Sequence, residues 1–137
     1  MKNIGNLGEA KVLAKFVELG VQVYIPFGDG STVDLVADFN GKLNRVQIKS
    51  TEKDTDGSLV FSICSTTRRA GGEIQKHIYS SDEIDYFALY SSVTDEVYLL
   101  PIEKAPTKKF SLRYKEPYNA SSNRAEDFLI TKILGVE

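Results

Sequence analysis

A hairpin pattern in residues 31–50, STVDLVADFNGKLNRVQIKS, constrains the fold more than any other part of this 137-residue chain. At its centre stands Asn40-Gly41, a dipeptide typical of two-residue type I′ turns, in which both central residues need a positive φ. Apolar and polar residues alternate on both sides of this dipeptide, as they do in half-buried strands. The stretch therefore predicts two antiparallel strands joined by a tight turn.

The turn also fixes which side chains of the hairpin face each other. With Asn40-Gly41 as the loop, Asp34 lies opposite Gln47, and Lys49 lies one position further along the same face. Directly opposed side chains in a sheet have Cβ atoms about 5 Å apart. We therefore expect a carboxylate, an amide and an ammonium group to converge. A structural ion pair across the two strands explains the same residues equally well.

Residues 4–19 predict an amphipathic helix that precedes the hairpin. Asn3 or Asn6 is a suitable N-cap, and Gly20 a suitable terminator. Four residues form the expected apolar stripe: Leu7, Ala10, Ala14 and Val17. Glu9 lies in the first turns, where the helix dipole favours a carboxylate. Taken alone, it is typical of a solvated helix glutamate.

The remaining segments predict further strands and one more helix. Residues 21–25, 59–64, 86–90, 97–102 and 108–114 are the expected strands. We expect 59–64 to pair with the returning strand of the hairpin, and the nearly continuous apolar run 86–90 to be a central strand. Residues 65–76 lack periodicity and predict a loop, and residues 124–134 predict a helix that Gly135 closes. Together these elements indicate a mixed α/β fold.

The chemistry-bearing residues resemble the active site of the PD-(D/E)xK nuclease superfamily. Its pattern is a strand aspartate, a hairpin, and then an acid-x-Lys pair on the returning strand, with a glutamate on an upstream helix. Here Asp34 precedes Gln47-Ile48-Lys49, in which glutamine replaces the second acid, and the helix segment GNLGE ends at Glu9. GNLGE, VDLVAD and QIKS together are most similar to a bacterial branch that includes homing endonucleases. The likeness extends through residues 85–100 into the LRYKEP and NRAEDF segments.

This resemblance implies a restriction-endonuclease-like core, an antiparallel-rich mixed sheet flanked by helices, in a single domain over residues 1–137. It implies a Mg²⁺-dependent endonuclease that hydrolyses double-stranded DNA, with Mn²⁺ as a substitute ion. The implied catalytic residues are Glu9, Asp34, Gln47 and Lys49. The implied metal ligands are Asp34, the Ile48 carbonyl and Glu9. Lys49 would either stabilise transition-state charge or deprotonate the attacking water.

Two loops are candidates for contact with DNA phosphates. Residues 65–76 contain Arg68, Arg69 and Lys76, and arginine side chains suit phosphate oxygens. This segment is either a solvated surface loop or a phosphate-binding arm. Ser31 ends the loop before Asp34, where backbone N–H groups could approach a phosphate.

The charge distribution permits a nucleic-acid partner although the net charge is −2. Residues 40–53 contain four Lys or Arg and one acid, and residues 103–116 contain five and two, whereas 81–102 contain five acids and no base. This pattern is compatible with one positive face. The sequence has no apolar run of about 18 residues and no signal-peptide pattern, and its single Cys64 suits a reducing compartment. We therefore expect a cytoplasmic protein without a membrane association.

Several other functions remain compatible with the sequence. The glutamine at position 47 motivates a catalytically silent DNA-binding module on the same scaffold. A Holliday-junction resolvase shares the scaffold, and an interaction domain without nucleic acid is a further alternative. For an endonuclease, we expect a homo-oligomer, a dimer or a tetramer, because one small domain cuts one strand and a symmetric assembly can cut both.

Overall fold

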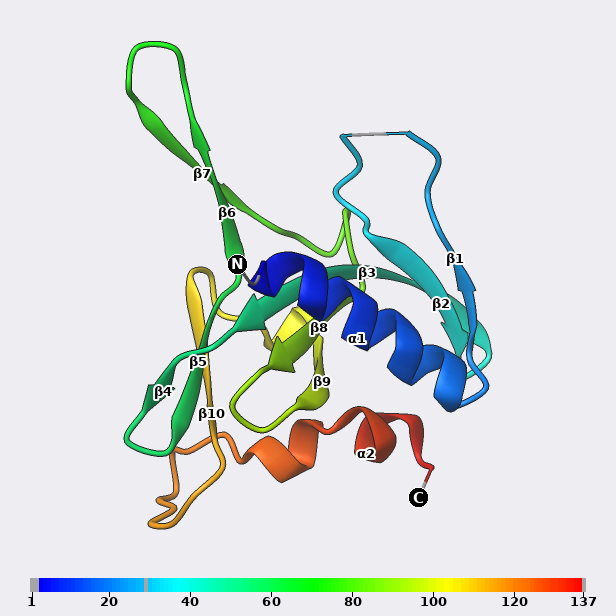
Figure 1. Ribbon diagram of the computed structural model, residues 1–137, viewed down its shortest axis with the longest axis vertical. Coiled ribbons are helices and arrows are strands. Elements are labelled where there is room, and N and C mark those ends of the chain that lie inside the picture. The colour runs from blue at the N-terminus through cyan, green and yellow to red at the C-terminus, as the bar shows by residue number, and fades with distance from the viewer. Residues whose placement is uncertain (1–2, 29, 137) are drawn as a thin grey trace.

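The computed structural model describes residues 3–28 and 30–136 and is built around a five-stranded mixed sheet (Figure 1). The strand order is β1-β2-β3-β8-β9. The strands are β1 (Gln22–Tyr24), β2 (Leu35–Phe39), β3 (Lys42–Thr51), β8 (Tyr86–Ser91) and β9 (Glu96–Pro101). β3 and β8 pair in parallel, and the other neighbours pair antiparallel. The expected antiparallel-rich mixed sheet, with 86–90 as a central strand, is confirmed.

The predicted hairpin is formed by β2 and β3. Asn40 and Gly41 have φ values of 55° and 73°, the left-handed conformation that this turn requires. Phe39 pairs with Lys42, and the register continues to Leu35 opposite Val46. The predicted turn and register are therefore confirmed along the whole of β2.

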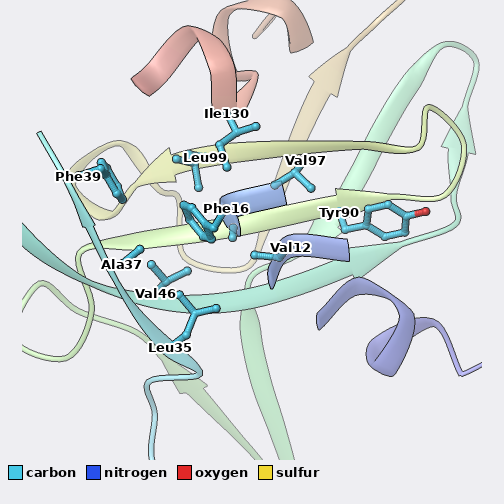
Figure 2. Packing of buried hydrophobic residues seen from close by; sticks show 11 residues of the cluster. Val12, Phe16, Leu35, Ala37, Phe39, Val46, Tyr90, Val97, Leu99 and Ile130 are labelled. Carbon is cyan, nitrogen blue, oxygen red and sulfur yellow. The ribbon is translucent and has the colours of Figure 1, made fainter. Parts of the chain in front are cut away.

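One face of the sheet is covered by α1 (Ile4–Glu18) and α2 (Ile130–Leu134). The apolar cluster between these helices and the sheet includes Val12, Phe16, Leu35, Ala37, Phe39, Val46, Ala88, Tyr90, Val97, Leu99 and Ile130 (Figure 2). Asn3 caps α1, because its side chain accepts a 3.1 Å hydrogen bond from Asn6 N. Of the predicted apolar stripe of α1, only Leu7 packs against this cluster, and Ala10, Ala14 and Val17 are exposed. The buried positions are Gly8, Val12 and Phe16, whereas Val17 is 62% exposed.

The other face of the sheet is covered by a smaller sheet and a short helix. The small sheet has the order β10-β5-β4, with β10 (Lys109–Arg113), β5 (Ser58–Ser62) and β4 (Asp54–Thr55), and the helix is η2 (Ala125–Phe128). Between the two sheets lies a second apolar cluster that includes Leu59, Phe61, Phe87 and Leu89. The expected pairing of 59–64 with the hairpin strand is wrong. The neighbours of β3 in the sheet are β2 and β8, whereas β5 pairs with β4 and β10 in the separate small sheet.

The expected loop at 65–76 is instead a two-stranded arm. β6 (Cys64–Arg68) and β7 (Ile74–Ile78) pair antiparallel and project away from the rest of the molecule (Figure 1). Every residue of β7 is exposed, so its sequence lacks the alternation by which a half-buried strand is recognised. Cys64, at the foot of the arm, is a buried free thiol.

The expected C-terminal helix is divided into two pieces, η2 and α2. Leu129 separates them with an extended backbone (φ −53°, ψ 139°) and forms a bridge to Tyr98 of β9. Gly135 ends α2 with φ 72°, as predicted. A further short helix, η1 (Ile102–Lys104), follows β9. Within residues 3–28 and 30–136, no helix has the length and apolarity that a membrane span requires.

Candidate active site

Asp34 lies where β2 and β3 separate. It stands one residue before β2 begins, and its backbone N donates a 2.8 Å hydrogen bond to Val46 O. Its Oδ2 accepts a 2.7 Å hydrogen bond from the backbone N of Ile48 in β3. Beyond the end of the backbone pairing between β2 and β3, the Asp34 carboxylate therefore makes the hydrogen bond to β3. This bond fixes the orientation of the carboxylate.

The carbonyl of Ile48 points to the same edge of β3 as Asp34. In an extended strand, the N–H and C=O of one residue point to the same neighbour. The Ile48 N–H points to Asp34, so the carbonyl does as well. β2 begins only at Leu35, opposite Val46, so this stretch of β3 lies beyond the paired part of β2. A carboxylate and a backbone carbonyl thus meet at one strand edge.

A close contact between α1 and β3 brings Glu9 to this edge. Gly8 packs directly on Ser50, and a Cβ added to Gly8 would lie 1.7 Å from Ser50 Oγ and 2.9 Å from Ser50 Cβ. The next residue, Glu9, then lines a hollow of about 410 Å³ together with Asp34 and Ile48. The absence of a side chain at position 8 therefore sets the approach of the helix that carries Glu9.

Gln47 and Lys49 extend from the other face of β3, because successive side chains alternate along a strand. Gln47 is 7% exposed, and its Nε2 donates a 2.6 Å hydrogen bond to Thr32 O, which orients its Oε1 away from that carbonyl. Lys49 is half-buried, and its Nζ donates a 3.3 Å hydrogen bond to Ser65 Oγ in β6. This face therefore supplies a fixed amide and an ammonium group that faces the foot of the arm.

Asp34 and Lys49 affect each other's ionisation although they belong to different hydrogen-bond networks. Burial raises the pKa of the Asp34 carboxyl, while the Ile48 N–H and the positive charge of Lys49 act in the opposite direction. Burial lowers the pKa of the Lys49 ammonium group, and the negative charge of Asp34 opposes this change. The two groups form a half-buried pair of opposite charges at the junction of β2 and β3.

The oxygen atoms at this junction suit a hard divalent cation. Within the described part of the chain, no cluster of three or more His, Cys, Asp or Glu side chains is arranged around a metal position. A cation at the junction would instead have the carboxylates of Asp34 and Glu9 and the backbone carbonyl of Ile48 as ligands from the protein. Mg²⁺ prefers oxygen ligands and commonly uses only one or two carboxylates. The donor set therefore fits this ion.

Six of the predicted site residues line two separate hollows. Glu9, Asp34 and Ile48 line the first hollow. Ser31, Gln47 and Lys76 line a second one of about 380 Å³, which lies between the arm and the segment before β2. Arg68 and Arg69 are exposed on the arm and line neither hollow.

Two residues that contact Lys49 were not identified from the sequence, Ser65 and Tyr79. Ser65 accepts the hydrogen bond from Lys49, and the Tyr79 ring lies beside the same ammonium group. Both lie in or next to the segment expected to be a loop, and a loop has no strand register that would relate its residues to β3. The pairing of β6 with β7 places Ser65 at the foot of the arm, and the sequence pattern does not predict this pairing.

The helix-covered mixed sheet, with acidic groups at the parting of two strands, defines a restriction-endonuclease-like fold. A family model described as PD-(D/E)XK endonuclease matches residues 1–130. The chain belongs to this endonuclease family, whose members generally use divalent metal ions and act on DNA.

A solved structure supports the same fold. The bacterial homing endonuclease I-Ssp6803I superposes with a TM-score of 0.77 at 20% sequence identity, over 97% of this chain and 90% of that chain. The resemblance to a bacterial homing-endonuclease branch, which the sequence motifs suggested, is therefore also present in the fold. No curated protein matches the chain.

Proposed function

We propose that this protein is a Mg²⁺-dependent endonuclease that hydrolyses phosphodiester bonds of double-stranded DNA, in the manner of a homing endonuclease. The observation that carries the proposal is the junction of β2 and β3, where the Ile48 N–H fixes the Asp34 carboxylate. The charge of Lys49 and the helix carboxylate of Glu9 lie beside it. Mn²⁺ would replace Mg²⁺, because it accepts the same oxygen ligands.

Each residue of the junction has a distinct role in this proposal. Asp34, the Ile48 carbonyl and Glu9 would hold the cation, and the Gln47 amide oxygen would add a neutral donor. A bound Mg²⁺ supplies an activated water and neutralises charge on the phosphate. The Ile48 N–H donates to Oδ2 of Asp34 and so fixes the carboxylate that would bind the cation. Lys49 stabilises the negative charge that develops on the phosphate oxygens.

The second hollow supports a path for the DNA backbone past this junction. Ser31 lines it from the segment before β2, and Lys76 lines it from the arm. Arg68 and Arg69 lie further along the arm and extend its positive charge, and Arg68 pairs with Ile74 at the last register position. In our proposal these four residues contact phosphates, which position the duplex without reading its sequence.

We further propose that the protein acts as a homo-oligomer in the cytoplasm. A junction of this kind cuts one strand, and a symmetric dimer or tetramer presents a second junction to the other strand. Sedimentation velocity of the purified protein tests this point, and a monomer at micromolar concentration with duplex bound would contradict it.

The test of nuclease function uses a pool of supercoiled plasmids with randomised inserts, because the target site is unknown. We expect double-strand cleavage in Mg²⁺, with the cut ends captured by ligation and sequenced. On a duplex that carries the recovered site, Asp34→Asn and Lys49→Ala should each lower cleavage by at least about 10²-fold. Asp38→Asn, which changes an exposed aspartate of β2, is the matched control and should cut normally.

Two outcomes would overturn this proposal. Equal cleavage in excess chelator would show that the reaction needs no metal ion. Equal cleavage by Lys49→Ala would show that Lys49 has no catalytic role. The neutral Gln47 favours one competing function, a catalytically silent DNA-binding module, because it supplies one negative charge fewer than a second acid. Undiminished duplex binding, with no cleavage in any divalent ion, would select that module.

A further inference from the structure

The ammonium group of Lys49 is held by two residues outside the hairpin. Its Nζ donates a 3.3 Å hydrogen bond to Ser65 Oγ and lies 5.4 Å from the centroid of the Tyr79 ring. Ser65 Oγ is in turn hydrogen-bonded to the Tyr79 hydroxyl. The three side chains therefore form one polar cluster at the foot of the arm.

The Tyr79 ring is itself fixed on two sides. It packs edge-on against Phe87 of the central strand, with 5.6 Å between ring centroids, and edge-on against His77 of β7, at 4.9 Å. His77 Nε2 lies 2.8 Å from a carboxylate oxygen of Glu83. The contact partner of Lys49 is thus anchored both to the apolar core and to the arm.

The side chains in contact with the Lys49 ammonium group, Ser65 and Tyr79, are neutral, which distinguishes Lys49 from the other basic residue on this face of β3. The Arg45 guanidinium forms an ion pair with the Asp85 carboxylate, with hydrogen bonds of 3.0 and 3.1 Å. Among residues 3–28 and 30–136, Lys49 has no carboxylate within 4.0 Å of its Nζ. A hydroxyl and an aromatic face orient an ammonium group and leave its charge available to a phosphate.

We propose that Ser65 and Tyr79 are positioning residues that hold the Lys49 ammonium group at the site of cleavage, an inference that rests on the proposed nuclease function. Lysine has a long flexible side chain, and a displacement of about 1 Å from the productive position can cost about 10²-fold in rate. Ser65 pairs with His77 at the foot of the arm. The element proposed to bind DNA therefore also holds the catalytic lysine.

The kinetic test compares Ser65→Ala with Ser65→Thr, which keeps the hydroxyl. On the duplex recovered above, Ser65→Ala should lower kcat by about 10-fold or more with KM within about twofold, because positioning acts on the transition state. Ser65→Thr should retain most of the rate. Tyr79→Phe, which keeps the ring, should lose less than Ser65→Ala. Ser111→Ala and Tyr24→Phe, at exposed positions, are the controls.

A double-mutant cycle separates positioning from a structural role. In a Lys49→Ala background, Ser65→Ala should cause no further loss of rate, because both changes remove one interaction. The proposal would be contradicted if Ser65→Ala lowered the rate as much in the Lys49→Ala background as it does in the wild-type background. A Ser65→Ala protein with unchanged kcat would also contradict it.

A crystallographic comparison tests the positioning whether or not the protein cuts DNA. Crystals of the wild type should show Lys49 Nζ ordered beside Ser65 and Tyr79, and crystals of Ser65→Ala should show it displaced or without density. An unmoved ammonium group in Ser65→Ala would overturn this inference. Failure of the wild type to cut any duplex would instead overturn the proposed function.

Discussion

Gly8 is the residue on which the placement of Glu9 depends. A Cβ at position 8 would lie 1.7 Å from Ser50 Oγ, and real Cβ atoms do not approach another atom so closely. Ser50 Oγ is buried and, within the described residues, without a hydrogen-bond partner. The helix therefore lies on β3 at a separation that only glycine permits, and Glu9 reaches the hollow beside Asp34 as a result.

Gly8→Ala should destabilise the protein by about 1–3 kcal/mol, because the added methyl group overpacks the contact between α1 and β3. Gly5→Ala, in the same helix, is the matched control. Its Cβ would meet only the Asn3 side chain at 3.3 Å, so the higher helix propensity of alanine should leave its stability unchanged or improved. Urea unfolding of both variants measures the difference, and equal free energies of unfolding would contradict this account of Gly8.

At the scale of elements, a charged contact holds the start of β8 against β3. The Arg45 guanidinium binds the Asp85 carboxylate and also donates to the carbonyls of Asp82 and Ser81, at 2.7 and 2.9 Å. The side-chain hydrogen bonds from Arg45 are the main reason that the pKa of Asp85 lies below its ordinary value. This contact stands next to Val46 and Tyr86, the first pair of the parallel ladder.

Asp85→Asn should therefore destabilise the protein by about 1–3 kcal/mol at neutral pH. Because the folded-state pKa of Asp85 is lowered, its contribution is complete above the unfolded value of about 3.9 and is lost as the pH falls through the folded-state value. The difference between wild type and variant should thus be constant above about pH 5 and shrink near pH 3. Urea unfolding at pH 7 and pH 3 measures it, with Asp38→Asn as control. A difference that grows on acidification would contradict the assignment.

The elements that the sequence predicts well are those whose signal is local. The Asn40-Gly41 turn, the register of β2 and β3 and the Gly135 helix end each depend on a few neighbouring residues. The partners of β5, which are β4 and β10, depend instead on how distant segments of the chain come together, which no short segment specifies. The arm was not predicted because both faces of β7 are exposed to solvent, so its sequence lacks an apolar–polar alternation.

The candidate site follows the same division. Asp34, Gln47 and Lys49 are brought near one another by the hairpin alone, so their relation could be inferred from the register. Glu9 was placed by resemblance, since its position depends on the packing of α1. The buried face of α1 was missed because its first position, Gly8, is not hydrophobic. Ser65 and Tyr79 could not be inferred without the β6–β7 pairing.

In the whole molecule, two projections stand beside the candidate site. In Figure 1 the β6–β7 arm and the segment that leads into β2 lie toward the top of the view, and α2 lies toward the bottom. Ser31 and Thr32 from one projection and Thr67, Gln75 and Lys76 from the other line a common hollow, with Gln47 between them. This arrangement suits an elongated anionic partner.

Binding of duplex DNA should consequently depend on salt and on the arm. Arg68→Ala, Arg69→Ala and Lys76→Ala should each weaken binding for all sequences and reduce the slope of log K against log salt by about 1. Lys132→Ala, an exposed lysine in α2, should leave that slope unchanged. Fluorescence anisotropy over a salt series measures the slopes. An unchanged slope in all three arm variants would exclude the arm from the interface.

The most direct test of the central claim is the position of a bound ion. A crystal grown with Mn²⁺ and measured at the manganese absorption edge should show an anomalous peak beside the Asp34 carboxylate and the Ile48 carbonyl, and the peak should be lost in Asp34→Asn. A peak elsewhere in a saturated crystal, with the junction of β2 and β3 empty, would contradict the claim that this junction is the catalytic centre.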